Sequence, residues 1–174
     1  MTRDTTSGSD FGGDVNRTGI GMTGDEALRQ LNSFLRGEIS AAETYRMAID
    51  KVADSEAASQ QAANLGLLRE IQEEHGRAAQ AIRDRIRELG GEASDSSGAW
   101  GAWAKFTQGT ANLFGDSSAL KALKEGEEHG LKDYSDGLDD IDITSAELVQ
   151  NQLIPAQQRH INLLDQLIGA QGRA

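Results

Sequence analysis

The sequence has no cysteine, one proline and few aromatic residues, and each scarcity narrows what it can encode. Without cysteine, disulfides, iron–sulfur clusters and thiolate zinc sites are excluded. Aromatic residues make up 5% of the chain, so a core must consist mainly of Leu, Ile and Ala. No run approaches the roughly 18 apolar residues of a membrane-spanning helix. We therefore expect one aliphatic core and no transmembrane segment.

Basic residues are also scarce, with 17 against 28 acidic ones and a net charge of -11. This balance argues against nucleic acid as a partner, because neutralising phosphates requires a basic face. It argues equally against an anionic membrane surface, and it favours long-range attraction of metal cations. The first residues, MTRDTTSGSDFGGD, lack the apolar segment of a secretory signal, so the expected location is the cytoplasm.

The 174 residues fit one domain with a tail. Residues 1–22 are rich in Gly, Ser, Thr and Asp without periodicity, which predicts a flexible tail. Residues 23–170 carry helical periodicity and predict a bundle. Its four expected helices cover residues 23–53, 56–89, 116–139 and 144–168. Capping boxes mark two starts, Thr23 with Glu26 and Thr144 with Glu147, while Gly90-Gly91 marks a stop and Pro155 predicts a kink.

The connections between these helices predict the topology. The links within the first and second helix pairs are short, which makes their helices antiparallel neighbours. Residues 90–115 form a long crossover between the pairs, with aromatic side chains at Trp100, Trp103, Phe106 and Phe114. Two antiparallel hairpins joined by one crossover define an all-α, ferritin-like four-helix bundle.

Each predicted apolar stripe is interrupted by polar residues near its middle. Tyrosine follows glutamate by seven residues in the first and third helices, and Gln-x-x-His occurs in the second and fourth. At about 1.5 Å per residue, these groups lie at matching heights in the bundle. Two carboxylates and two imidazoles should therefore meet at one buried point. The residues are Glu38, Tyr45, Gln72, His75, Glu127, Tyr134, Gln157 and His160.

Buried carboxylates need compensation, and two kinds are consistent with this pattern. One is a divalent metal ion bound where the carboxylates and imidazoles meet. The other is a set of hydrogen bonds from protonated histidines and from tyrosine hydroxyls. The neighbouring acidic residues and the third histidine point away from the stripes, so we expect them to be solvated: Glu70, Glu73, Glu74, Glu125, Glu128 and His129.

The chain resembles the ferritin-like superfamily, which includes ferritin, bacterioferritin and rubrerythrin, over residues 23–168. More narrowly, it resembles an uncharacterised bacterial four-helix-bundle family related to rubrerythrin. The segments that carry the likeness are LNSFLRGEISAAETYRMAI, the Trp-containing crossover and KALKEGEEHGLKDYSDGL. The resemblance implies terminal carboxylate ligands at Glu38 and Glu127 and imidazole ligands at His75 and His160. Gln72 and Gln157 occupy the places of two bridging glutamates, and Tyr45 and Tyr134 lie beside the glutamates.

Two functions are compatible with this reading. The first is a metal-binding bundle protein holding one or two iron or manganese ions and acting in redox or oxidative-stress chemistry. The second is a bundle without metal or catalysis, in which a degenerate di-iron site fixes the register of the helices. Three apolar residues lie beside the predicted stripes and could either widen the core or form the interface of a homodimer: Phe34, Ile39 and Leu67.

Overall fold

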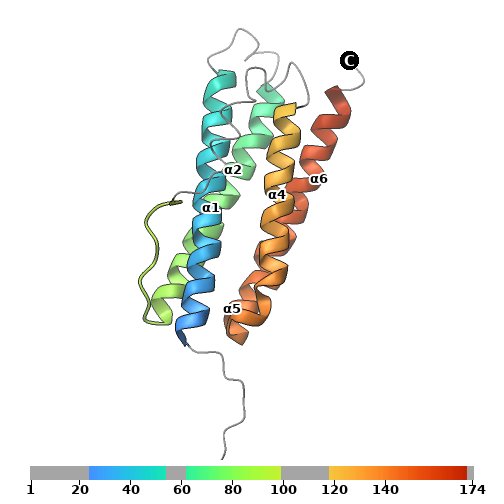
Figure 1. Cartoon of the computed structure of the whole chain (residues 1–174). Helices are drawn as coiled ribbons and strands as arrows, with labels where there is room; N and C mark the ends of the chain where they lie inside the picture. The colour runs from blue at the N-terminus through green and yellow to red at the C-terminus, as the bar shows by residue number, and fades with distance from the viewer. Residues whose placement is uncertain (1–23, 54–61, 99–117, 172–174) are drawn as a thin grey trace, which may run out of the picture.

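Four long helices form the body of the protein in a computed structural model that describes residues 24–53, 62–98 and 118–171. They are α1 (Gly24–Ala53), α2 (Ala62–Glu88), α4 (Ser118–Asp136) and α6 (Ile154–Gln171) (Figure 1). Within these ranges every regular element is helical, which confirms the predicted all-α four-helix bundle. The predicted tail and the four aromatic residues of the crossover lie outside the described residues.

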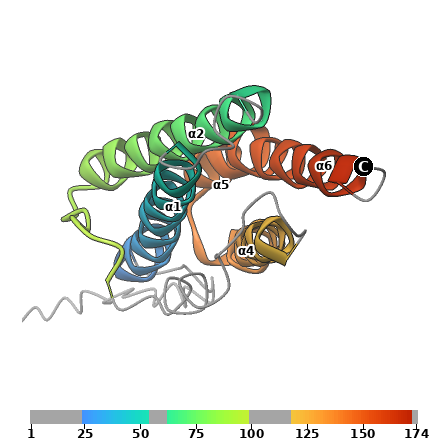
Figure 2. The ribbon, with the colours of Figure 1, turned by 90° about the horizontal axis from the view of Figure 1, so that it is seen from above.

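The helices pair as two hairpins. α1 packs most extensively along α2, and α4 packs along α6. Viewed down the bundle, α1 also neighbours α4, and α2 also neighbours α6, which closes a four-helix arrangement (Figure 2). None of the described helices is long and apolar enough to cross a membrane.

The predicted stop at Gly90 is confirmed by the hydrogen bonds at the end of α2. Gly90 adopts a positive φ of 76°, which glycine reaches without a steric penalty. Its N–H donates to the carbonyl of Arg87 at 2.9 Å, and the N–H of Gly91 donates to that of Ile86 at 2.9 Å. This is a Schellman motif, and it supplies partners for carbonyls that the helix leaves unpaired.

The capping residue predicted at Thr144 is wrong by two positions, because the observed cap is Asp142. α5 (Ile143–Leu148) is capped by Asp142, whose side chain accepts from the N–H groups of Thr144 and Ser145. A shorter segment, η1 (Leu138–Asp140), precedes it. The sequence favoured Thr144 because Glu147 completes a capping box, but the carboxylate of Asp142 satisfies two N–H groups at once and is also paired with Arg85 at 2.8 Å.

A π-helical turn, η2 (Val149–Leu153), joins α5 to α6 directly before Pro155. Proline has no N–H, and its ring crowds the carbonyl of the preceding turn of an α-helix. Wider π-helical bonding relieves that crowding, which explains the irregular turn at this place. Gln157 and His160 lie on α6 just beyond it.

The core consists of two apolar clusters. One gathers residues such as Ile49, Leu68 and Leu120, and the other gathers residues such as Leu35, Ile82 and Leu153. Phe34 is buried in the second cluster, and Ile39 and Leu67 are partly buried against the core, so all three enlarge the core. The buried polar residues are mostly those that the sequence placed near mid-bundle: Glu38, Ser40, His75, Glu127, Ser145, Gln157 and His160.

Candidate metal centre

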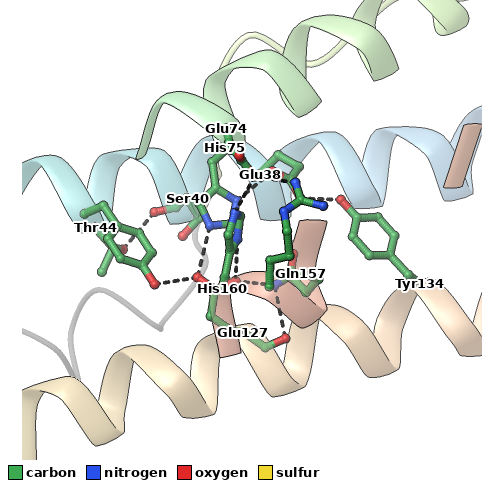
Figure 3. A network of polar contacts seen from close by, with 11 residues as sticks. Glu38, Ser40, Thr44, Glu74, His75, Glu127, Tyr134, Gln157 and His160 are labelled. Carbon is green, nitrogen blue, oxygen red and sulfur yellow. Dashed lines mark hydrogen bonds and ion pairs between the residues drawn. The ribbon is translucent and has the colours of Figure 1, made fainter. Parts of the chain in front are cut away.

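Each of the four long helices contributes a buried ionisable side chain to the middle of the bundle. Glu38 comes from α1, His75 from α2, Glu127 from α4 and His160 from α6. All four are at most 5% exposed. The structure therefore brings the four predicted ligands into one cluster (Figure 3).

The imidazole of His75 lies between two carboxylates. Its Nδ1 is 2.8 Å from Oε2 of Glu38, and its Nε2 is 3.0 Å from Oε1 of Glu127. His75 thus links the first hairpin to the second. Glu38 and Glu127 contact opposite nitrogens of the ring, so a single atom placed at Nε2 would face Glu127 and not Glu38.

Glu127 is surrounded by potential donors on both of its oxygens. Oε1 accepts from the hydroxyl of Tyr45 at 2.6 Å and faces His75. Oε2 accepts from Nε2 of Gln157 at 2.7 Å and lies 3.2 Å from Nδ1 of His160. A buried carboxylate with this number of partners meets the usual requirement for buried charge.

The two tyrosines cross between the hairpins. Tyr45 on α1 donates to Glu127 on α4, and Tyr134 on α4 donates to Glu38 on α1. The seven-residue spacing therefore places each tyrosine beside the glutamate of the other hairpin. Tyr134 is further held by Phe34, whose ring meets it edge-on at a centroid distance of 4.9 Å.

His160 also lies between two carboxylates, and the second of them is Glu74, which was predicted to be solvated. Nε2 of His160 is 2.9 Å from Oε2 of Glu74, and Arg159 donates to the same oxygen at 2.9 Å. The side chain of Glu74 is only 20% exposed. The helical phase of α2 places Glu74 away from the apolar stripe, which predicted a solvated side chain. The phase of one helix does not reveal that α6 packs against the side of α2 that carries Glu74.

Gln72 does not join the cluster in the way its spacing from His75 predicted. It is half-buried, whereas its neighbour Ile71 is fully buried against the core. The stripe of α2 runs through Leu68, Ile71 and His75, so the step of four from Leu68 to Gln72 was out of phase. Among the residues that the structure describes, Gln72 forms no hydrogen bond.

Gln157 does occupy its predicted place, and a glycine makes room for it. Its Nε2 donates to the backbone carbonyl of Glu127 at 3.0 Å as well as to the side chain. A Cβ atom at Gly130 would lie 2.8 Å from that nitrogen. The absence of a side chain at Gly130 therefore lets the amide reach the backbone of α4.

Burial and charge pull the pKa values of this cluster in opposite directions. Burial alone would lower the pKa of His75, but the carboxylates of Glu38 and Glu127 raise it to about 10. Burial alone would raise the pKa of Glu127, but His75 and His160 lower it to about 2. Burial and the adjacent carboxylates raise the pKa values of Tyr45 and Tyr134 well above 10, so both hydroxyls stay protonated and donate.

The placement of the two histidines limits the chemistry of the cluster. Each ring has a carboxylate oxygen at both nitrogens, yet a neutral imidazole carries only one N–H. One contact of each ring therefore needs an added positive charge, which can be a second proton or a metal ion. The possible ligand atoms of His75, Glu127 and His160 lie within 4.8 Å of one another, close enough for one ion to contact all three.

Fold and site together define a helical bundle protein with a buried cluster of carboxylates and imidazoles that could hold a metal. The chain belongs to the family described as Domain of unknown function (DUF2383), whose model matches residues 26–140. The matched range includes Glu38, His75 and Glu127 and ends before α6, which carries Gln157 and His160. Comparisons with curated proteins and with solved structures return no match.

Proposed function

We propose that this protein binds one divalent metal ion at mid-bundle through Nε2 of His75, Nδ1 of His160 and the carboxylate of Glu127. The observation that carries the proposal is that both imidazoles direct one nitrogen toward Glu127 and the other toward a second carboxylate. An ion placed beside Glu127 would take the Glu127-facing nitrogen of each ring and leave each ring one N–H for its other contact.

Glu38 and Glu74 would not bind the ion themselves but would orient the two histidines that do. Nδ1–H of His75 would donate to Glu38, and Nε2–H of His160 would donate to Glu74. Metal-bound histidines commonly donate their second nitrogen to a carboxylate, which fixes the tautomer and the ring orientation. The sequence predicted Glu38 as a ligand, but its position at the far nitrogen of His75 supports this orienting role instead.

The local charges favour one ion over two. Glu38, Glu74 and Glu127 supply three negative charges, which one divalent ion and the guanidinium of Arg159 balance. A second ion would leave two uncompensated positive charges in a buried site. Gln157 supports the same conclusion, since a neutral amide at the place of a bridging carboxylate adds no negative charge.

The ligand set favours iron or manganese. Two imidazoles and one carboxylate with open coordination positions suit Fe(II), and the same set accepts Mn(II) or Zn(II). We propose a ferritin-like relationship for the bundle on the basis of its paired hairpins and mid-bundle Glu and His residues. Open positions on a bound Fe or Mn ion would support the redox or oxidative-stress role that the sequence suggested.

One observation favours the second candidate function, a metal-free structural bundle. Glu127 is contacted by Tyr45, His75, Gln157 and His160, and the side chain of Glu38 by Tyr134 and His75. With both imidazoles doubly protonated, every one of these contacts is a hydrogen bond or an ion pair. Such a network fixes the register of four helices without any ion.

Metal titration of the purified protein distinguishes the metal-binding function from the metal-free structural bundle. After removal of bound metal, anaerobic calorimetric titration with Fe(II) and Mn(II) should give one site per chain. Glu127→Gln should lower the affinity by at least about tenfold, because it removes the only anionic ligand. His129→Gln is the matched control, since that histidine lies on the surface with its side chain 61% exposed. Absence of binding to the unaltered protein would favour the structural bundle.

A further inference from the structure

We infer that the metal ion enters from the face between α2 and α6, where Glu74 receives it and Arg159 covers Glu74. The inference rests on the proposed function, because it describes how the proposed site is filled. Glu74 and Arg159 are assigned roles in entry that binding at His75, Glu127 and His160 does not by itself require.

A surface cavity of about 350 Å³ marks this face. Glu70 and Glu74 of α2 line it on one side, and Arg159 and His160 of α6 line it on the other. His160 is the link inward, because its Nε2 contacts Glu74 in this cavity while its Nδ1 faces Glu127. The imidazole of His160 therefore stands between the surface cavity and Glu127.

Arg159 is placed to be displaced by an incoming cation. It donates to Oε2 of Glu74, the same oxygen that contacts His160. Its side chain is 58% exposed, so the guanidinium can leave Glu74 for solvent with little loss of packing.

A second cavity, between α1 and α4, is the rival route. It measures about 120 Å³ and also reaches the centre, at Glu38 and His75. Its walls combine small or apolar residues such as Gly37 and Leu123 with ionisable ones that include His129 and Asp133. Carboxylates therefore line both cavities, and we favour the α2–α6 cavity because it is about three times as large, so a cation that keeps part of its water shell fits there more easily.

Stopped-flow mixing of the metal-free full-length protein with Co(II) separates the two routes, with absorbance reporting arrival at the site. Arg159→Gln should raise the association rate about fivefold at low salt, and the gain should shrink as salt is added. Its dissociation rate into excess chelator should also rise, because the same side chain covers the exit. Glu70→Gln should slow association, since it removes a charge at the entrance without touching the proposed ligands.

Two matched variants should leave the association rate unchanged. Arg87→Gln makes the same change of charge at an exposed arginine paired with Asp84. Gly126→Leu narrows the α1–α4 cavity, and a Cβ there meets nothing within 4 Å. The inference is overturned if Arg159→Gln behaves like Arg87→Gln, or if Gly126→Leu slows association. The part of the inference in which Arg159 covers the exit is overturned if Arg159→Gln changes the association rate but not the dissociation rate. Absence of equilibrium Co(II) binding to the unaltered protein would instead reject the proposed function.

Discussion

At the scale of the residue, each ionised group of the centre relies on a small number of buried partners. Glu38 and Glu127 are buried on different hairpins, and His75 contacts both. Removing one member of such a buried set leaves another charged and unpaired, which costs far more than the pair contributes. The polar residues of the centre are therefore coupled, and single substitutions there will not add independently.

Gly130 gives a prediction about the room that is left for the side-chain amide of Gln157. In Gly130→Ala the new methyl group would collide with Nε2 of Gln157 and push the amide away from Glu127. Losing hydrogen bonds to a buried carboxylate should outweigh the better helix propensity of alanine and destabilise the protein by about 1 kcal/mol. Gly126→Ala is the matched control on the same helix, where a Cβ meets nothing, and it should stabilise by about 0.5–1 kcal/mol. Urea unfolding of both variants checks the opposite signs; equal effects would contradict the role given to Gly130.

The pair of His75 and Glu127 gives a prediction about pH for the metal-free protein. The pKa of His75 is raised from 6.5 to about 10, so its stabilising charge is fully present below pH 6.5 and is lost as pH rises through 10. The pKa of Glu127 is lowered from 4.5 to about 2, so its contribution is present above pH 4.5 and is lost as pH falls through 2. The free energy of unfolding should therefore be highest between pH 4.5 and 6.5.

Urea unfolding from pH 3 to pH 10 measures this profile. His75→Gln should remove most of the decline on the alkaline side while lowering the maximum. A decline that is the same in His75→Gln and in the surface variant His129→Gln would show that His75 does not cause it.

At the scale of the element, the ends of the helices determine where the site residues point. The π-helical turn before Pro155 sets the direction of α6, which carries Gln157 and His160. The hairpin of α4 and α6 is also joined to α2 through Arg85, which bonds to Asp142 at 2.8 Å and to Ser145 at 2.9 Å. The start of α5 is thereby fixed against the end of α2.

Asp142 gives the prediction at this scale. Asp142→Ala removes the cap of α5 and one of the partners of Arg85, and we expect a loss of about 1–2 kcal/mol in the free energy of unfolding. Asp84→Ala is the matched control, because Asp84 pairs with Arg87 on the exposed side of α2 and should cost less than about 0.5 kcal/mol. Chemical denaturation of the two variants compares them, and equal losses would remove the special role of the cap.

At the scale of the whole molecule, the bundle sets two apolar clusters around buried polar residues. The clusters supply stability through aliphatic burial. The polar residues supply specificity, because only one register of four helices brings both imidazoles against Glu127. A ligand bound between the hairpins would hold them together, since His75 belongs to the first hairpin and Glu127 and His160 to the second.

Thermal unfolding tests that consequence. A metal ion at one hundred times its dissociation constant should add about 2.7 kcal/mol of stability. For a chain of this size, that corresponds to a rise in Tm of roughly 5–10 °C. Fe(II) or Mn(II) should raise the Tm of the unaltered protein and of His129→Gln, but not that of Glu127→Gln. An equal rise in the Tm of Glu127→Gln would show that the ion binds at a site other than Glu127.

Much of the fold was accessible from periodicity, because apolar residues at helical spacing must share one face. The burial of Glu38, His75, Glu127 and His160 was predictable for the same reason, since each interrupts such a face. Gln72 was misplaced because one step of four instead of three rotates a residue away from the core. Glu74 was missed because its partners, Arg159 and His160, lie on another helix.

The sequence by itself determined the four long helices, their pairing and most of the polar residues that are buried together, because these follow from apolar spacing within helices and from the lengths of the links between them. Only the tertiary structure decided which nitrogen of each histidine faces which carboxylate, and that Tyr45 and Tyr134 serve the opposite hairpin. It alone decided that His160 and Arg159 both contact Glu74. These are contacts between helices, and they depend on rotations and heights that no pattern within one helix specifies.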